Sequence, residues 1–427
     1  MRLTAGRSVS ALLLSLCALI VSALLAAPGI SASHRATGRS QPQPTTDNPA
    51  RCQNDRVPPP PVDTSEDVAP GAESPSPLPV PDEPVGGTRM GECGVLQPAG
   101  AAAPPQVSAQ SWLIADLDSG QVLAARDPHG RQRPASLIKT LLSIVVIREL
   151  QPDMVVAGTQ EDAEQEGTKV GIGPGGSYTV HQLLMATVMQ SGNDTAFALA
   201  RALGGVPAAL DKMNTLAREL GALDTRAATP SGLDGPGMTT SAYDQALIFR
   251  AAMQHKEFVE AASTRSLDFP GYRDKRGFLI SNDNRLLETY PGFLAGKTGF
   301  TDDARHTYAA AARQDGHSLV VVLLRGERKE MGPLADQGAL LLDYGFGLVR
   351  QASRPVGSLV ERSPEVQPKQ DTGEAAGAVV GPAATITDRA STRTAFGTVG
   401  APLVLLAGLV VLLAGALYLR RRLARGR

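Results

Sequence analysis

The sequence has few of the residues on which metal and nucleic-acid binding usually depend. Its 427 residues include three cysteines, six histidines and one tryptophan, and only 4% are aromatic. The histidines form no ligand cluster along the chain, so we expect no metal. A formal net charge of −1 gives no electrostatic reason to expect a nucleic-acid partner. No repeat of 20–50 residues is present, which argues against a repeat architecture.

Two apolar segments predict export and membrane anchoring. Residues 1–33 have a basic start, an apolar centre and small residues at the end, as in a signal peptide. Residues 399–419 are apolar over a length sufficient for one transmembrane helix. Residues 420–427 carry five arginines, which are expected to remain in the cytoplasm. We therefore expect a single-pass protein of the cell membrane, with its bulk on the extracytoplasmic, cell-wall side.

Two segments rich in proline and small polar residues predict flexible spacers. Residues 34–107 and 351–398 bury too little apolar surface to offset the entropy of ordering them. The second would span roughly 40 Å end to end as a random chain. In the first, Cys52 and Cys93 form an even pair outside the cytoplasm, which predicts a disulfide. The interpretation is a disordered spacer pinned at one point.

The remaining residues, 108–350, predict one folded domain. Two short apolar runs separated by Asp-Ser-Gly indicate a β-hairpin near its start, and a series of helices follows. Strands at 293–301, 307–312 and 319–324 and a helix at 333–344 complete it. Strands from both ends of a domain pair readily in one antiparallel sheet. We therefore predict an α/β (α+β) fold with a five-stranded antiparallel sheet flanked by helices, and an all-helical subdomain.

Three short polar motifs are candidates for chemistry. Ser136 and Lys139 lie one turn apart at the start of a run that is apolar on every side, so this helix is expected to be buried. A buried amine is unfavourable unless it is paired or neutral. Ser191-Gly192-Asn193 falls in a turn between helices, and Lys297-Thr298-Gly299 falls on a strand. Each motif alone also fits an ordinary helix cap or a surface lysine.

In this order the three motifs are far more specific, because together they form the signature of the penicillin-interacting serine enzymes. From Ser108 to Tyr344 the chain resembles the D-alanyl-D-alanine carboxypeptidases, which are low-molecular-mass penicillin-binding proteins of serine peptidase family S11. It looks most like membrane-anchored actinobacterial members. The resemblance implies a β-lactamase/DD-peptidase-like transpeptidase fold. It also implies removal of the terminal D-alanine from peptidoglycan stem pentapeptides, with β-lactams as covalent inhibitors.

The resemblance also implies roles for individual residues. Ser136 would be the acyl-ester nucleophile, Lys139 its general base, and Ser191 a group that passes a proton to the leaving D-alanine. The substrate would be held by Asn193, Lys297, Thr298, Gly299 and the backbone of Phe300, which with the backbone of Ser136 would form the oxyanion hole. No metal or cofactor is implied, and we expect a monomer.

Two departures from the family pattern stand out. A small Ala-Gly pair usually follows the Lys-Thr-Gly strand, whereas this chain has Ala304-Arg305, so contacts to substrate there are open. Many members also carry a β-rich domain after the catalytic one, and residues 351–398 are too short and too polar to form it.

Three other functions were weighed. A phosphate-binding loop at Gly292 to Thr298 lacks one residue of the required spacing. A class A-like β-lactamase would add a glutamate between the second and third motifs, but Glu219, Glu257, Glu260 and Glu288 do not stand in its Glu-x-x-Asn pattern. A catalytically inactive penicillin-binding or wall-sensing module remains a third alternative.

Overall fold

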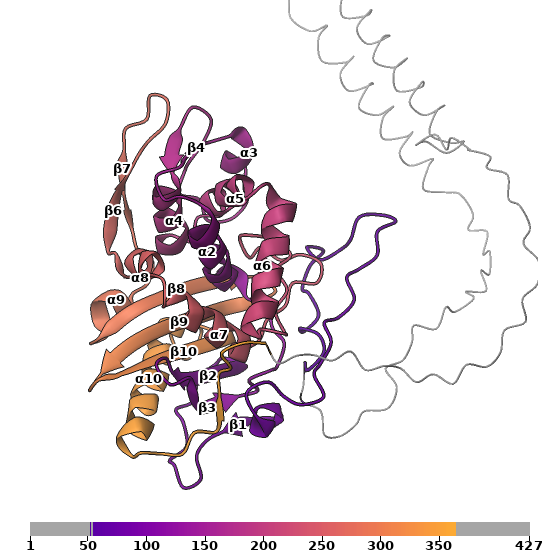
Figure 1. Cartoon of the computed structure of the whole chain (residues 1–427), viewed down its shortest axis with the longest axis vertical. Coiled ribbons are helices and arrows are strands. Elements are labelled where there is room, and N and C mark those ends of the chain that lie inside the picture. Colours follow the sequence, from indigo (N-terminus) through magenta and orange to yellow (C-terminus); the bar gives the residue numbers. More distant parts are fainter. Residues whose placement is uncertain (1–51, 53, 364–427) are drawn as a thin grey trace, which may run out of the picture. The chain divides into compact units, whose positions relative to one another are not determined.

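The computed structural model describes Cys52 and residues 54–363 (Figure 1). The predicted signal peptide and the predicted membrane span at 399–419 lie outside these residues. Within the described part of the chain, no helix is both long and apolar enough to cross a bilayer.

The domain combines a central sheet with helices on both faces. The strands are β1 (Val95–Leu96), β2 (Ser111–Asp116), β3 (Gln121–Arg126), β4 (Val155–Ala157), β5 (Ser177–Thr179), β6 (Ser266–Phe269), β7 (Phe278–Ser281), β8 (Phe293–Thr301), β9 (Arg305–Gln314), β10 (His317–Gly326) and β11 (Gly357–Ser358). The α-helices are α2 (Ile138–Glu149), α3 (Gln160–Ala163), α4 (Val180–Met189), α5 (Asn193–Ala202), α6 (Val206–Leu220), α7 (Ala242–Ala252), α8 (Lys256–Ser263), α9 (Leu286–Thr289) and α10 (Leu334–Arg350). Two 3₁₀ turns are η1 (Thr88–Gly91) and η2 (Ala135–Leu137).

The main sheet has the strand order β1-β3-β2-β10-β9-β8, and every pair in it is antiparallel. The five predicted strands run without interruption from β3 to the edge strand β8, so the pairing of the first hairpin with the last three strands is confirmed. The predicted count of five was too low. Two-residue strands from the flanking segments, β1 and β11, both pair with β3 and extend the sheet to seven strands.

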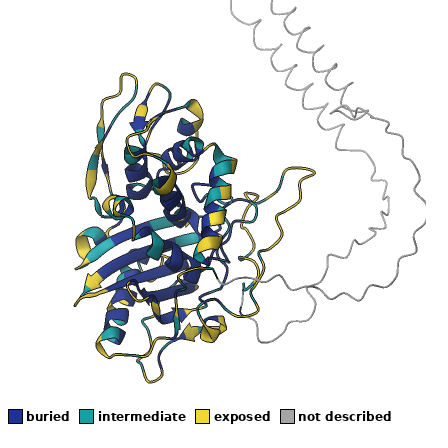
Figure 2. Cartoon of the chain, viewed as in Figure 1, coloured by how far each residue is buried: buried dark blue, intermediate teal, exposed yellow. Residues whose placement is uncertain are grey.

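The two faces of the sheet belong to two hydrophobic cores, because side chains alternate along each strand. On β2, Trp112 and Ile114 join the core beneath α10, while Leu113 and Ala115 join the larger core beneath the other helices. Helix α10 covers one face, and α7 packs against the opposite face (Figures 1 and 2). Helices α2, α4, α5 and α6 contact one another above that face and form the predicted helical part.

Helix α2 lies at the centre of the larger core. Its residues from Ile138 to Val146 are all buried, including Lys139 and Ser143 (Figure 2). The prediction of a buried helix from a run that is apolar on every side is therefore confirmed. Ser136 is not in this helix but in the single 3₁₀ turn η2 that precedes it, after Ala135 with φ +47°.

Local side-chain and glycine contacts define several helix ends. Thr179 forms a capping box with Gln182 at the start of α4, and Ser241 accepts the Asp244 N–H at the start of α7. Helix α6 ends at Gly221, which adopts the left-handed conformation. Helix α8 and the β6–β7 hairpin were not predicted.

The proline-rich segment before the domain is packed against it, so the prediction of a disordered spacer is wrong for its described residues, Cys52 and 54–107. We call these residues the arm. Val85, Met90 and Leu96 of the arm are buried in the larger core. The guanidinium of Arg131 donates to the backbone carbonyls of Arg56, Leu78 and Pro79. A composition argument misses such contacts, because the acceptors are backbone atoms present in any sequence.

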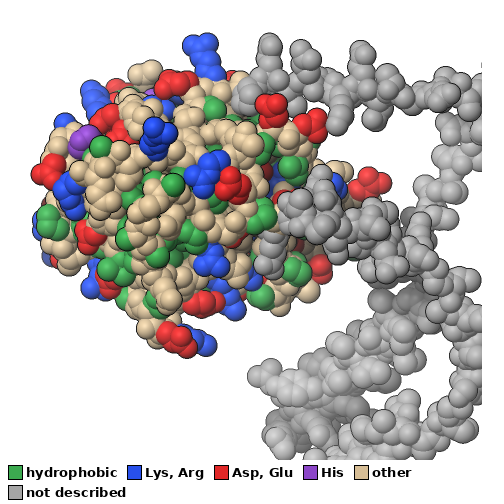
Figure 3. All heavy atoms as spheres, turned by 90° about the horizontal axis from the view of Figure 1, so that it is seen from below, with side chains coloured by type: hydrophobic (Ala, Val, Ile, Leu, Met, Phe, Trp, Pro, Cys, Tyr) green, Lys and Arg blue, Asp and Glu red, His purple; other side chains and the backbone are tan. Residues whose placement is uncertain are grey.

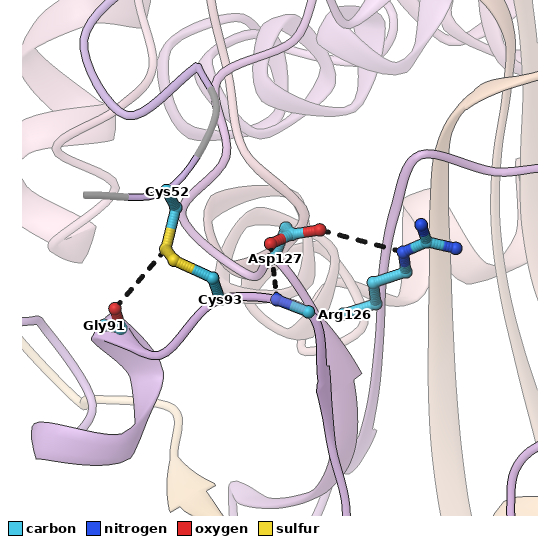
Figure 4. The surroundings of a disulfide bond; sticks show 6 residues. Cys52, Gly91, Cys93, Arg126 and Asp127 are labelled. Carbon is cyan, nitrogen blue, oxygen red and sulfur yellow. Dashed lines mark hydrogen bonds and ion pairs between the residues drawn. A yellow bond between two sulfur atoms is a disulfide. The ribbon is translucent and has the colours of Figure 1, made fainter. Parts of the chain in front are cut away.

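The predicted disulfide between Cys52 and Cys93 is present, with 5.2 Å between the Cα atoms (Figure 4). Next to it, the N–H of Gly94 donates to the Asp127 carboxylate across 2.8 Å, which ties this part of the arm to the end of β3. The disulfide therefore closes a loop of the arm, and the hydrogen bond from Gly94 holds this loop against the domain.

The segment after the domain is also partly ordered, so residues 351–363 do not belong to a flexible linker. Val356 and Leu359 are buried, and the N–H of Ser363 donates to the carbonyl of Glu219 at the end of α6. Seen from below, the surface intersperses hydrophobic groups with both signs of charge (Figure 3). This mixture fits the nearly neutral composition.

Candidate active site

The first two motifs meet around the amine of Lys139. Its Nζ donates to Ser136 Oγ at 2.8 Å, to Asn193 Oδ1 at 2.7 Å and to the carbonyl of Ser231 at 2.6 Å. The Lys139 residue has no exposed surface. All three acceptors are neutral groups, so no carboxylate offsets the burial of a positive charge through them.

The third motif brings a second buried amine near the first. Lys297 on β8 is 1% exposed, and its Nζ donates to the carbonyl of Thr298 at 2.9 Å. Burial lowers the pKa of the Lys139 amine well below its usual range, and the charge of Lys297 lowers it further. Burial also lowers the pKa of Lys297. The arrangement therefore favours an uncharged Lys139.

An uncharged Lys139 retains all three contacts. It can donate its two protons to Asn193 Oδ1 and the Ser231 carbonyl, because neither of these oxygens carries a proton. Its lone pair then faces Ser136, whose hydroxyl is the one partner of the three that can donate. The geometry therefore directs proton abstraction to Ser136.

A cleft of about 520 Å³ lies over these residues. Six of the predicted site residues are among those that line it, namely Ser136, Ser191, Asn193, Thr298, Gly299 and Phe300. The Lys139 and Lys297 amines lie beneath the lining rather than on it. All predicted catalytic and substrate-binding residues are thus gathered at one cleft.

Two glycines bring the chain close to the backbone of Ser136. A Cβ atom added to Gly232 would lie 2.0 Å from the carbonyl oxygen of Ala135 and 3.0 Å from the nitrogen of Ser136. One added to Gly299 would lie 2.9 Å from the same nitrogen. The segments that contain Gly232 and Gly299 therefore flank the nitrogen of Ser136. Because neither glycine has a side chain, a reacting oxygen could approach this nitrogen between them.

Ser191 occupies a strained position in the wall. It has φ +60°, and its hydroxyl is buried without a hydrogen-bond partner among the described residues. Such a group usually destabilises a fold by about 1–3 kcal/mol, and unsatisfied or strained residues concentrate at functional sites. A hydroxyl left unpaired beside Ser136 is available to a leaving amine.

Carboxylates hold the surrounding loops. Asp194 accepts the N–H groups of Val170, Gly171 and Ile172, and the amide of Asn193 donates to the carbonyl of Glu166. Asp283 accepts the hydroxyl of Thr298 at 2.7 Å. Roles for Asp194 and Asp283 were not predicted. Asp194 adjoins the second motif, whereas no sequence signal marked Asp283.

Arg305 lies at the start of β9 with φ +57°, and its guanidinium pairs with Glu327 at 3.4 Å. It does not line the cleft. Although Arg305 replaces the small residue of the family pattern, its side chain therefore does not enter the described wall of the cleft.

One His and two Asp residues lie close enough together to suggest a metal site, although no cluster was expected from the sequence. They are His129, Asp224 and Asp244, away from the cleft. The two nitrogens of His129 are already occupied, because they contact Asp224 Oδ2 and the carbonyl of Val85. Arg131 also donates to Asp224. A cation would meet a guanidinium there, so the group suits a structural role.

The cleft geometry agrees with an independent comparison of the whole chain. A family model described as D-alanyl-D-alanine carboxypeptidase matches residues 98–328. The chain belongs to the D-alanyl-D-alanine carboxypeptidase family. The match begins within the arm and ends just after β10, so it includes all three motifs.

Similar carboxypeptidases differ in how much of their length is matched. The D-alanyl-D-alanine carboxypeptidase DacB2 of Mycobacterium tuberculosis is 47% identical over 267 residues, which are 62% of this chain and 90% of DacB2. The carboxypeptidase DacF of Bacillus subtilis is 29% identical over 245 residues, which are 56% of this chain and 62% of DacF.

Solved structures confirm the DD-peptidase fold. A D-alanyl-D-alanine carboxypeptidase from Mycobacterium tuberculosis is 46% identical, with a TM-score of 0.59 over 62% of this chain and all of that one. The Streptomyces K15 DD-transpeptidase, at 23% identity, has a TM-score of 0.55 over 58% of this chain and all of that one. The second likeness concerns the fold alone.

Proposed function

We propose that this protein is a serine carboxypeptidase that removes the terminal D-alanine from peptidoglycan stem pentapeptides ending in D-Ala-D-Ala. The observation that carries the proposal is the 2.8 Å contact between Lys139 Nζ and Ser136 Oγ beneath an open cleft. A serine hydroxyl is a weak nucleophile at neutral pH and needs an adjacent base. An amine whose charge is disfavoured by burial is such a base.

Acylation begins when Lys139 takes the proton of Ser136 and the serine oxygen attacks the carbonyl carbon between the two D-alanines. The developing oxyanion is held by the N–H groups of Ser136 and Phe300. Collapse of this intermediate breaks the peptide bond, and the proton passes from Lys139 through Ser191 to the leaving amine. D-alanine departs, and an ester on Ser136 remains.

Deacylation uses the same base in the second half of the reaction. A water molecule gives a proton to Lys139 and attacks the ester carbon, and Ser136 recovers a proton as its oxygen leaves. Thr298 and the charge of Lys297 would receive the carboxylate of the terminal D-alanine, while Asn193 would hold the peptide amide. A β-lactam would acylate Ser136 in the same way.

The cellular setting forms part of this proposal. The signal peptide at 1–33 and the span at 399–419 would place the domain, as a monomer, on the cell-wall side of the membrane. The Cys52–Cys93 disulfide supports an extracytoplasmic location, since disulfides persist in oxidising compartments. Localisation of a tagged chain in membrane fractions, with protease access from outside the cell, would test it.

One assay separates the three functions considered. The full chain is incubated with an acyl peptide ending in D-Ala-D-Ala, with a D-Ala-L-Ala peptide as control, and separately with penicillin. Release of D-alanine from the first peptide alone supports the carboxypeptidase. A stable penicillin adduct without peptide turnover would instead support a sensor, and rapid penicillin hydrolysis would support a β-lactamase.

A further inference from the structure

The arm contacts Arg133, which precedes the cleft residue Ser136 by three positions. The side chain of Arg133 is 2% exposed, and its Nε and Nη2 both contact the carboxylate of Glu66, Nη2 at 2.7 Å. Its Nη1 donates to the carbonyl of Pro59 at 2.7 Å. A paired fork of this kind is the strong, oriented form of an arginine–carboxylate contact. The arm therefore supplies the carboxylate, that of Glu66, which pairs with the buried guanidinium of Arg133.

The arm also satisfies a buried carboxylate in the turn between β8 and β9. The side chain of Asp303 has no exposed surface, and its two oxygens accept the N–H of Val62 and, at 3.2 Å, the hydroxyl of Ser65. Arg133 Nε is 4.0 Å from the same carboxylate. Without the arm, Asp303 would lose both of these donors. A buried carboxylate without donors is strongly unfavourable, so the turn would have to rearrange toward water.

Asp303 is linked in turn to a third segment. Its N–H lies 3.4 Å from a carboxylate oxygen of Asp234, and the other oxygen of Asp234 accepts the Thr301 hydroxyl at 2.9 Å. Arg133, Asp234 and Asp303 thus connect three stretches of chain behind the cleft.

The same three stretches meet again at the nucleophile. Arg133 is three residues from Ser136, Asp234 is two residues from Gly232, and Asp303 is four residues from Gly299. Gly232 and Gly299 are the two residues whose backbones pack against the nitrogen of Ser136. A shift of the network behind the cleft would therefore move the walls around the Ser136 N–H.

We propose that Glu66 and Ser65 are positioning residues of this enzyme, which hold the Arg133–Asp303–Asp234 network and thereby align Ser136 with Gly232 and Gly299. The arm would therefore contribute to catalysis by positioning the residues of the site. The inference deepens the proposed function, since it concerns the rate of the same acylation. Displacements of about 1 Å in a catalytic arrangement can lower rates by about 100-fold.

The test compares arm variants of the full chain with a matched control. Glu66→Gln removes the charge that pairs with Arg133, and Ser65→Ala removes one donor to Asp303. The control is Glu92→Gln, which breaks the exposed Arg89–Glu92 pair elsewhere in the arm. For each variant, active sites are counted with labelled penicillin, and kcat and KM per titrated site are measured at 25 °C beside the unfolding midpoint.

We expect Glu66→Gln to lower kcat and the rate of penicillin acylation per titrated site by roughly tenfold, with KM within about twofold of the wild-type value. Ser65→Ala should lower them by about threefold, and Glu92→Gln should change neither. Unchanged rates per site in both arm variants would overturn the proposal, whether or not the midpoint falls. If Glu66→Gln does not fold, Ser65→Ala decides.

The proposed function can fail separately in this experiment. A wild-type chain that is acylated by penicillin but releases no D-alanine would refute the carboxypeptidase. The ratio of acylation rates between variant and wild type would still test the role of the arm.

Discussion

Lys139 donates to Ser136 across 2.8 Å from a position that has no exposed surface. The remaining acceptors of this amine are the Asn193 side-chain oxygen and the Ser231 carbonyl, neither of which has a proton to give. In its uncharged form the amine therefore keeps its lone pair for the proton of the Ser136 hydroxyl, and this role as a base underlies the predictions on activity below.

Replacement of the nucleophile should abolish both reactions. Ser136→Ala is expected to lower D-alanine release by at least about 10³-fold and to prevent a penicillin adduct, because no oxygen remains to carry the acyl group. The fold should persist, since the lost hydroxyl contacts Lys139 alone among the hydrogen bonds found. Mass spectrometry after penicillin treatment checks this; an adduct on the variant would exclude Ser136 as nucleophile.

Removal of the second amine should change the pH dependence of acylation. In Lys297→Met the nearby positive charge is lost, so the pKa of Lys139 rises and its free base forms only at higher pH. We expect the acid limb of the acylation rate to move upward by at least about 0.5 pH unit. The measurement is penicillin acylation from pH 5 to 10. A lower rate with an unmoved limb would show that Lys297 binds the substrate without influencing Lys139.

A methyl group at Gly232 should close the space around the Ser136 nitrogen. Gly232 has φ +88°, and the added carbon would lie 2.0 Å from the Ala135 carbonyl oxygen. Gly232→Ala should therefore lower acylation by more than about 100-fold. Gly316→Ala is the matched control, because Gly316 has φ +84° and open space around it. It should lose about 1 kcal/mol of stability and keep its activity.

The buried group around His129 should make stability depend on pH. Burial and the neighbouring Asp224 raise the pKa of Asp244, so the folded state binds a proton that the unfolded state releases. Burial opposes protonation of His129, but Asp224 outweighs it and raises that pKa too. Between the unfolded and folded pKa values, both groups therefore contribute less stability as the pH rises.

The variant Asp244→Asn isolates one of these contributions. In denaturant unfolding from pH 5 to 9, the free energy of unfolding should fall less steeply with pH in the variant than in the wild type. The slopes should differ by up to about 1.4 kcal/mol per pH unit, which corresponds to one bound proton. Asp315→Asn, which changes a carboxylate that is 75% exposed, is the control and should follow the wild type. Parallel wild-type and Asp244→Asn curves would contradict the assignment.

The disulfide should stabilise the arm against the domain. Its sequence separation is 41 residues, and a loop of this length corresponds to about 4 kcal/mol in the chain-entropy model. The double variant Cys52→Ser/Cys93→Ser should lose up to this amount in the free energy of unfolding. An unchanged unfolding midpoint would mean that the packing of the arm alone holds the loop closed.

The sequence was sufficient to predict which residues gather at the cleft, because local rules apply to the first of the three motifs. The three-residue spacing of Ser136 and Lys139 places both on one side of a helical turn, and the apolar run after them requires burial. The burial of this helix depends on neighbours in sequence, and the structure confirms it.

Contacts between distant segments could not be predicted in this way. Glu66 and Arg133 are 67 residues apart, and nothing in the composition of a proline-rich segment indicates that its carbonyls and carboxylates will meet buried arginines. Asp283 and the β6–β7 hairpin were missed for the same reason, since their places are fixed by tertiary packing rather than by a local pattern.

The neutral hydrogen-bond acceptors around Lys139 have a consequence for the evolution of this chain. An amine kept uncharged in a core lowers the stability of the fold, and an apolar residue of similar shape would relieve that penalty. Selection for thermal tolerance alone would therefore be expected to remove Lys139 early, and with it the activity. A lysine at this position of a well-packed helix is therefore favoured by the proposed function and disfavoured by the stability of the fold.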